Sequence, residues 1–174
     1  MSRVEGKTFD AWMAALGGAP FARARLLDIL DVLDRVCDAV RYAHARGVLH
    51  LDLKPETVMI NDFGRVMLMD WGIAKVVEGD LPGAEGPGGR LYGTPNYVAP
   101  EQIESPESLD ERTDVSGLGG LLYAALAQRP PHQGTSAVAT LAAAALCEVE
   151  RPTALPPSVP AELVALAMDA LSYA

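Results

Sequence analysis

Lysine is scarce in this sequence, and positive charge as a whole is outnumbered. Only Lys7, Lys54 and Lys75 are lysines among 14 Lys and Arg residues, whereas Asp and Glu number 23, so the formal net charge is −9. A chain this acidic lacks the basic surface with which proteins bind nucleic acid or an anionic membrane. The composition therefore argues against nucleic acid as a partner.

Cysteine and long apolar runs are also rare. The two cysteines, Cys37 and Cys147, both fall in apolar helical patterns, so we predict two buried thiols in a reducing cytosol rather than a disulfide. No run approaches the roughly 18 apolar residues of a membrane span, and no basic segment followed by an apolar one opens the chain. These absences predict a cytoplasmic chain with no membrane segment.

What is present is the composition and periodicity of a globular domain. The length of 174 residues and the hydrophobic content of 49% fit one domain. Apolar residues at three- and four-residue steps predict a long amphipathic helix over 24–46 that Gly47 ends. Further helices are predicted over 114–128, 136–147 and 161–172. The expected fold class is mainly α with a small β-hairpin, built from strands at Val58–Ile60 and Val66–Met69, with another short strand at Val48–Leu49.

Two other segments have distinctive compositions. Residues 114–128 are apolar all round, which predicts a buried helix. Gly117, Gly119 and Gly120 lower its helix propensity, so their presence suggests close packing of its backbone. Residues 79–90 are rich in Gly and Pro without periodicity, which predicts a flexible loop.

Three segments carry the residues with chemical potential. They are His50-Leu51-Asp52-Leu53-Lys54-Pro55-Glu56-Thr57, then Met69-Asp70-Trp71-Gly72, and then Gly93-Thr94-Pro95-Asn96-Tyr97-Val98-Ala99-Pro100-Glu101. In this order and spacing they resemble the catalytic half of a bacterial-type serine/threonine protein kinase. The resemblance covers nearly the whole chain. It implies one partial kinase domain over 1–174, a kinase-like C-terminal lobe with the N-terminal lobe absent.

The resemblance implies roles for the residues of these segments. Phosphoryl transfer needs a carboxylate near the acceptor hydroxyl, a cation near the transferred phosphate and oxygen ligands for Mg²⁺. Asp52 matches the first role, Lys54 the second and Asp70 the third, with Thr57 in the place of a second metal ligand. ATP and Mg²⁺ are the implied cofactors, near Lys54 and Asp70, and a protein is the implied substrate.

Further residues match supporting positions of the family. Met59 would form the floor under the adenine, although a core methionine fits equally well. Thr94 belongs to the segment that faces the substrate. His50 and Trp71 would form part of the spine that links the two lobes, and Glu101 would lack the arginine partner that the family places after the end of this chain.

Two aspartates have an alternative interpretation. Asp114 matches the kinase residue that holds the backbone of the catalytic loop by hydrogen bonds, but a simple helix cap is also open. Asp62-Phe63-Gly64 looks more like the metal-binding motif of the family than Asp70-Trp71-Gly72 does. Because Asp62 falls inside the predicted hairpin turn, we assign the metal role to Asp70. His44 and His132 lie outside these motifs and are predicted to be structural or exposed.

The sequence also departs from the kinase pattern. Thr57 replaces an asparagine that holds the second Mg²⁺, and a hydroxyl is the poorer ligand. Leu51 replaces an arginine that reads a phosphorylated activation loop. The glycine-rich loop, the phosphate-binding strand lysine and its glutamate partner are not in the sequence, and positioning ATP is most of kinase catalysis. The chain on its own is therefore predicted to be inactive.

Three hypotheses about function follow. The chain is a kinase lobe that is active when an N-lobe is supplied elsewhere, a pseudokinase-like binding or scaffold module with a protein partner, or a truncated gene fragment. Serine/threonine specificity rests, by resemblance, on Lys54 and on Gly93-Thr94-Pro95.

Overall fold

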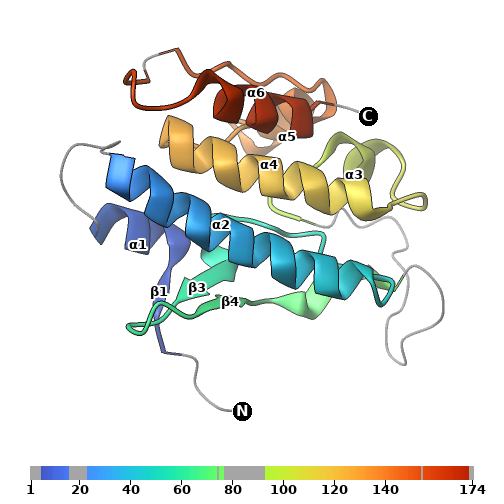
Figure 1. The fold of residues 1–174 in the computed structure, drawn as a ribbon. Helices are drawn as coiled ribbons and strands as arrows, with labels where there is room; N and C mark the ends of the chain where they lie inside the picture. Colours follow the sequence, from blue (N-terminus) through green and yellow to red (C-terminus); the bar gives the residue numbers. More distant parts are fainter. Residues whose placement is uncertain (1–4, 16–22, 74, 77–92, 154, 173–174) are drawn as a thin grey trace.

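The computed structural model describes residues 5–15, 23–73, 75–76, 93–153 and 155–172 (Figure 1). The loop predicted over 79–90 lies outside the described residues. No helix in the described ranges combines the length and the apolar character that crossing a membrane requires.

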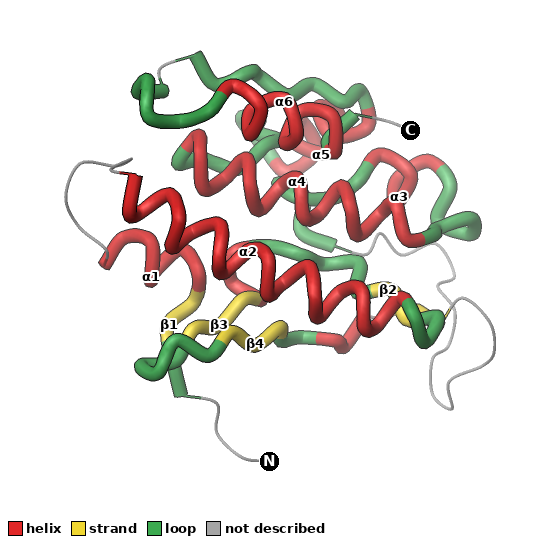
Figure 2. Tube along the Cα trace, viewed as in Figure 1, coloured by secondary structure: helices red, strands yellow, loops and turns green. Residues whose placement is uncertain are grey.

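Helices dominate the structure, and the strands are short. The helices are α1 Phe9–Ala15, α2 Arg23–His44, α3 Pro100–Glu104, α4 Glu111–Ala127, α5 Ala137–Ala145 and α6 Ala161–Ala170, with single 3₁₀ turns at Pro55–Thr57 and Trp71–Ile73. The strands are β1 Lys7–Thr8, β2 Val48–Leu49, β3 Val58–Ile60, β4 Val66–Leu68 and β5 Lys75–Val76. Figure 2 shows α4 between α2 and α6, with the β1-β3-β4 sheet on the other side of α2. The predicted mainly α fold with a small hairpin is confirmed.

The hairpin belongs to a sheet that is larger than predicted. β3 and β4 pair antiparallel, with Met59 opposite Met67, and β1 adds a third antiparallel strand on the other edge of β3. Gly6 permits this approach, since a Cβ there would lie 2.7 Å from the carbonyl oxygen of Ile60. A separate pair joins β2 to β5. β1 and β5, each of two residues, were not predicted.

The core lies between α2, α4 and the hairpin. Ile29 and Val36 of α2, Leu121 of α4 and Val58 of β3 are buried in one apolar cluster. α4 is buried on almost all sides, as predicted. Its glycines permit close contact: a Cβ added at Gly119 would lie 2.6 Å from the Cβ of Ala170 in α6. α2 ends at His44, two residues earlier than predicted, and Gly47, at φ +68°, lies in the turn that follows it.

Two sequence-based expectations need correction. Cys37 is exposed rather than buried, because the stripe of α2 that enters the core passes through Val36 and Val40. Cys147 is only partly buried, and both thiols are free. The short helices α1 and α3 were not predicted. α3 begins at Pro100, a residue that favours the first position of a helix, but five residues show no helical periodicity.

The contact between α4 and α6 generates a first prediction. Gly119→Ala should lower the free energy of unfolding by about 1–3 kcal/mol, because the added methyl group overpacks the helix contact. This loss should occur although alanine has the higher helix propensity, by about 1 kcal/mol. Urea unfolding followed by circular dichroism measures it. Val115→Ala, at an exposed position of the same helix, should change stability by less than about 0.5 kcal/mol. An unchanged or more stable Gly119→Ala variant would contradict the close contact.

Candidate active site around the 50–57 loop

One buried carboxylate holds the start of the 50–57 loop. Asp114, in the first turn of α4, is 1% exposed. Its two oxygens accept hydrogen bonds from the backbone N–H groups of His50 and Leu51, each at 2.8 Å. The cap of α4 is Asp110, whose side chain accepts from the backbone N–H of Arg112. Asp114 is thus not the helix cap, and its carboxylate is committed to the loop.

His44 completes the surroundings of this carboxylate. Its Nε2 lies 2.7 Å from Oδ2 of Asp114 and its side chain is only 12% exposed, so the C-terminal end of α2 is tied to the start of α4. Sequence reasoning left His44 without a partner. The two residues lie 70 positions apart, and nothing local in the sequence signals their pairing.

Asp52, Lys54 and Thr94 form a hydrogen-bonded cluster. The ammonium group of Lys54 donates to Oδ2 of Asp52 at 2.5 Å and to Oγ1 of Thr94 at 2.6 Å. The hydroxyl of Thr94 donates to Oδ1 of Asp52 at 2.9 Å, across 42 positions of sequence. A carboxylate and an ammonium group are therefore held in one charge-assisted network by a hydroxyl from a different segment.

The hydroxyl of Thr57 is turned into the loop. Thr57 is 2% exposed. Its Oγ1 accepts from the backbone N–H of Lys54 at 3.2 Å and donates to the carbonyl oxygen of Lys54 at 2.9 Å. A short hydroxyl side chain commonly satisfies the backbone of its own turn in this way. The sequence placed Thr57 in a metal-ligand position, and the structure uses its oxygen to hold the 3₁₀ turn Pro55–Thr57.

His50 connects the loop to the segment that carries Asp70. Nδ1 of His50 accepts from the backbone N–H of Asp52 at 3.3 Å, so its proton lies on Nε2, which donates to the carbonyl oxygen of Met69 at 2.9 Å. The buried imidazole meets the ring of Trp71 edge-on, with 4.6 Å between ring centroids. The structure thus brings His50 and Trp71 into direct contact.

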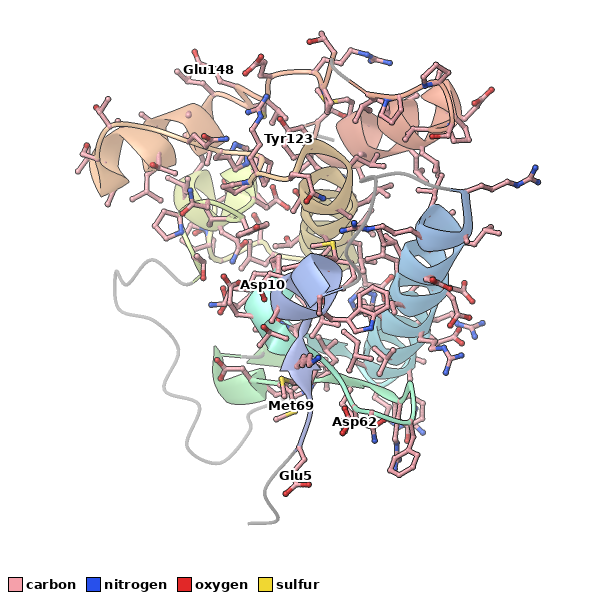
Figure 3. The ribbon with its side chains drawn as sticks, turned by 90° about the vertical axis from the view of Figure 1, so that its left-hand side faces the viewer. Glu5, Asp10, Asp62, Met69, Tyr123 and Glu148 are labelled. Atoms are coloured by element: carbon pink, nitrogen blue, oxygen red, sulfur yellow. The ribbon has the colours of Figure 1, made fainter. Side chains whose placement is uncertain are left out.

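Asp70 and Asp62 occupy different ends of the hairpin. Asp70 follows β4, is exposed and has φ 63°, a left-handed conformation that is uncommon outside glycine. Asp62 lies in the turn, where Oδ1 of Asn61 accepts from the backbone N–H groups of Phe63 and Arg65. Figure 3 shows Asp62 apart from Met69, the residue before Asp70. The placement of Asp62 inside the turn is as predicted.

Met59 lies on the sheet face that points away from the core. Val58 and Ile60 are buried in the main cluster and Val66 and Leu68 pack against it, whereas Met59 and its cross-strand partner Met67 do not belong to it. Because side chains alternate along a strand, Met59 and Met67 share the opposite, half-buried face. This placement does not fit the alternative of a core methionine.

Leu51 is part of the packing rather than of the polar site. It is buried in a small cluster with Leu49 and Leu109, and its carbonyl oxygen accepts from the side chain of Gln102 at 2.9 Å. Leu51 has φ 67°. Glu101, next to Gln102, forms no ion pair within the part of the chain that the structure describes.

A hollow of about 240 Å³ opens beside Pro55 and Tyr97, which belong to the segments of Lys54 and Thr94. Burial raises the pKa of the Tyr97 hydroxyl, and the nearby carboxylates of Glu56 and Asp10 raise it further. Figure 3 shows Asp10 on α1, and Asp10 is one of the residues that line the hollow. The hollow has a mainly apolar wall and carboxylates close to it; its lining includes Asp10, Met13, Pro55, Tyr97, Ala124 and Arg129.

The described residues contain no group of three or more His, Cys, Asp and Glu side chains arranged to hold a metal ion. A magnesium ion carried by a nucleotide needs fewer protein ligands, usually one or two carboxylates beside the phosphates. Asp70 offers an exposed carboxylate for such an ion, whereas the oxygen of Thr57 is already used by the loop. The residues therefore fit one nucleotide-bound Mg²⁺ better than two.

Comparisons with known proteins identify a family for this chain. The model of the protein kinase domain family matches residues 19–173. The chain is 34% identical over 176 residues to serine/threonine-protein kinase Pkn1 of Myxococcus xanthus, covering 99% of this chain and 24% of that protein. It is 34% identical over 142 residues to a probable serine/threonine-protein kinase of Streptomyces coelicolor, with 82% of this chain and 21% of that protein covered. For serine/threonine-protein kinase PknB of Mycobacterium tuberculosis the identity is 32% over 142 residues, with 82% and 22% covered.

The chain belongs to the protein kinase domain family, because the family model covers nearly all of it. The chain is similar to the three bacterial serine/threonine kinases named above. It spans about a fifth to a quarter of the length of each of them.

The buried carboxylate of Asp114 generates a second prediction. Asp114→Asn should lower the free energy of unfolding by about 1.5–3 kcal/mol for each charged hydrogen bond that it loses, because an amide N–H₂ would face a backbone N–H donor. Thermal and urea unfolding measure the loss. Glu111→Gln, an exposed change in the same first turn, should cost less than about 0.5 kcal/mol. Equal stability of the two variants would show that the carboxylate does not hold the loop.

Proposed function

We propose that residues 1–174 form a partial protein kinase domain, the C-terminal lobe of an enzyme that transfers the γ-phosphoryl group of ATP to a serine or threonine of a protein. The cluster of Asp52, Lys54 and Thr94 carries this proposal. It combines the carboxylate and the cation that phosphoryl transfer to a hydroxyl requires with a threonine of the segment proposed to face the substrate.

Each residue of the cluster has a separate role in the proposed reaction. The substrate hydroxyl oxygen forms a bond to the γ-phosphorus while the bond from that phosphorus to the ADP oxygen breaks. Asp52 accepts the hydroxyl proton, and Lys54 neutralises charge on the transferred group. Thr94 holds both side chains in place before substrate arrives. Bound Mg²⁺-ATP supplies the phosphoryl donor, and Asp70 would hold its metal ion.

The rest of the nucleotide site is proposed on the face that carries Met59. Met59 and Met67 present a half-buried apolar surface on the side of the sheet opposite the core, which suits a flat adenine ring. Phosphate positioning by a second lobe is most of kinase catalysis. We therefore propose that these 174 residues alone are inactive, and that activity requires an N-lobe, whether joined or supplied separately. A cytoplasmic location fits this substrate and this cofactor.

The hollow beside Tyr97 supports a protein as the substrate. It lies next to the segments of Lys54 and Thr94, and its mainly apolar wall can receive a side chain of a peptide bound across the cluster.

A pseudokinase-like binding or scaffold module is the second candidate, and two observations favour it. The oxygen of Thr57 is used within the loop, so the second metal site is weakened. Leu51 is buried among leucines, where it cannot read a phosphate group. Under this candidate the lobe binds a protein partner without nucleotide. A truncated gene fragment would bind neither a partner nor a nucleotide.

Nucleotide binding is tested by thermal unfolding of the purified chain. At ten times the dissociation constant, Mg²⁺-ATP adds about 1.4 kcal/mol of stability, which should raise the melting temperature by about 3–6 °C. Asp70→Ala should abolish the rise because the metal ligand is lost, and removal of Mg²⁺ should do the same. Asp62→Ala, the matched change in the hairpin turn, should leave it intact. No rise in a chain that melts cooperatively would argue against nucleotide binding by this lobe.

Catalysis is tested by joining the N-lobe of the Myxococcus xanthus kinase ahead of Glu5. The fusion protein should transfer ³²P from ATP to a protein acceptor, and Asp52→Asn should slow transfer by about 10²–10⁴-fold. Thr94→Ser, which keeps the hydroxyl, should retain far more activity than Thr94→Val. Equal phosphoryl transfer by the parent fusion and by Asp52→Asn would refute the proposed catalytic function. Specific capture of a protein partner by the inactive chain would then support the binding module.

A further inference from the structure

The segment that carries Thr94 is held at a second place, away from the cluster. The backbone N–H of His132 donates to the carbonyl oxygen of Asn96 at 3.2 Å, and the side-chain amide of Asn96 donates to the carbonyl oxygen of His132 at 2.8 Å. His132 belongs to the connector 128–136 between α4 and α5. These two bonds, the Asn96–His132 pair, join the Thr94 turn to that connector across 36 positions of sequence.

Asn96 lies inside the turn whose first residue is Thr94. The backbone N–H groups of Tyr97 and Val98 both donate to the carbonyl oxygen of Thr94, at 2.8 and 2.9 Å. The turn and the connector also pack on the same part of α4, since a Cβ at Gly120 would lie 3.2 Å from Tyr97 and 3.7 Å from Pro131. A shift of Asn96 would therefore move the backbone of Thr94.

The connector is a firm point of attachment. His132 is 2% exposed, and Nδ1 of its ring has no hydrogen-bond partner among the described residues. Burial lowers the pKa of His132, and a hydrogen bond with the backbone of Glu148 partly offsets this. Because its side chain is buried, His132 is held by the protein around it.

We propose that Asn96 is a positioning residue for the hydroxyl of Thr94, and that through it the α4–α5 connector sets the geometry of the Asp52, Lys54 and Thr94 cluster. Asn96 touches none of the proposed reacting groups and acts through the turn. The catalytic meaning of this positioning rests on the proposed function, whereas the positioning itself can be measured without any reaction.

The scarcity of lysine makes the measurement direct. In the full chain with ¹³C- and ¹⁵N-labelled lysine, NMR should show three side-chain signals, from Lys7, Lys54 and Lys75. Asn96→Asp keeps the shape of the side chain but removes the donor. It should move the Lys54 signal toward its position in Thr94→Val, where the bond to Lys54 is absent, and leave the other two signals in place. The amides of Tyr97 and Val98 should exchange with solvent about tenfold faster.

A matched control distinguishes positioning from general loosening. Gln133→Ala changes the neighbouring residue of the connector, whose side-chain amide also donates to a backbone carbonyl, that of Pro130. It should leave the Lys54 signal and both amides unchanged. An unmoved Lys54 signal in Asn96→Asp, or an equal movement in Gln133→Ala, would overturn the proposal.

Two further experiments address variants that fail to fold and the effect of Asn96 on activity. Asn96→Ala replaces Asn96→Asp if the latter does not melt cooperatively, and failure of both variants to fold would overturn the proposal, because Asn96 would then support the whole fold. In the N-lobe fusion, Asn96→Asp should lower kcat about tenfold and leave KM for ATP unchanged. A fusion that transfers no phosphate refutes the proposed function, while the lysine and amide signals still decide the positioning.

Discussion

The site depends on the buried carboxylate of Asp114. Removing a carboxylate from water is costly unless donors replace its hydration, and here the N–H groups of His50 and Leu51 and the ring of His44 surround it. The same bonds set the backbone of the 50–57 loop where Leu51 takes a left-handed conformation. α4, which carries Asp114, is in turn packed closely against α6 at Gly119. The geometry of the polar site therefore depends on the apolar contact between α4 and α6.

The cluster of Asp52, Lys54 and Thr94 is satisfied internally before any substrate is present. Each charged group of the half-buried pair Asp52 and Lys54 has a partner, so neither charge is buried unpaired. In the same loop, the two residues that depart from the kinase pattern, Leu51 and Thr57, have structural contacts. Leu51 fills an apolar cluster, and Thr57 holds its own turn. Both side chains therefore contribute to the local structure of the loop, one by apolar packing and one by hydrogen bonds to the backbone.

The long periodic helices and the short strands β2, β3 and β4 were predicted from the sequence, whereas several other short elements were not. The apolar stripe of α2 and the apolar surface of α4 extend over several turns, and Asn61-Asp62-Phe63-Gly64 is a strong turn signal between β3 and β4. The helix α1 and the strand β1 were not predicted, since neither is long enough for a hydrophobic repeat to identify it. Cys37 was placed on the wrong side of α2, since one helical position separates the buried Val36 from the exposed thiol.

The sequence by itself determined the family, the order of the motifs, and the helices and hairpin that carry them, because these depend on residues close together in the chain. Tertiary structure alone decided which groups meet. The contacts of His44 with Asp114, of Lys54 with Thr94 and of Asn96 with His132 join residues from 36 to 70 positions apart. The orientation of Thr57 and the sheet face of Met59 depend on that packing as well. Such contacts form only when the chain has buried its apolar surface, so no local pattern announces them.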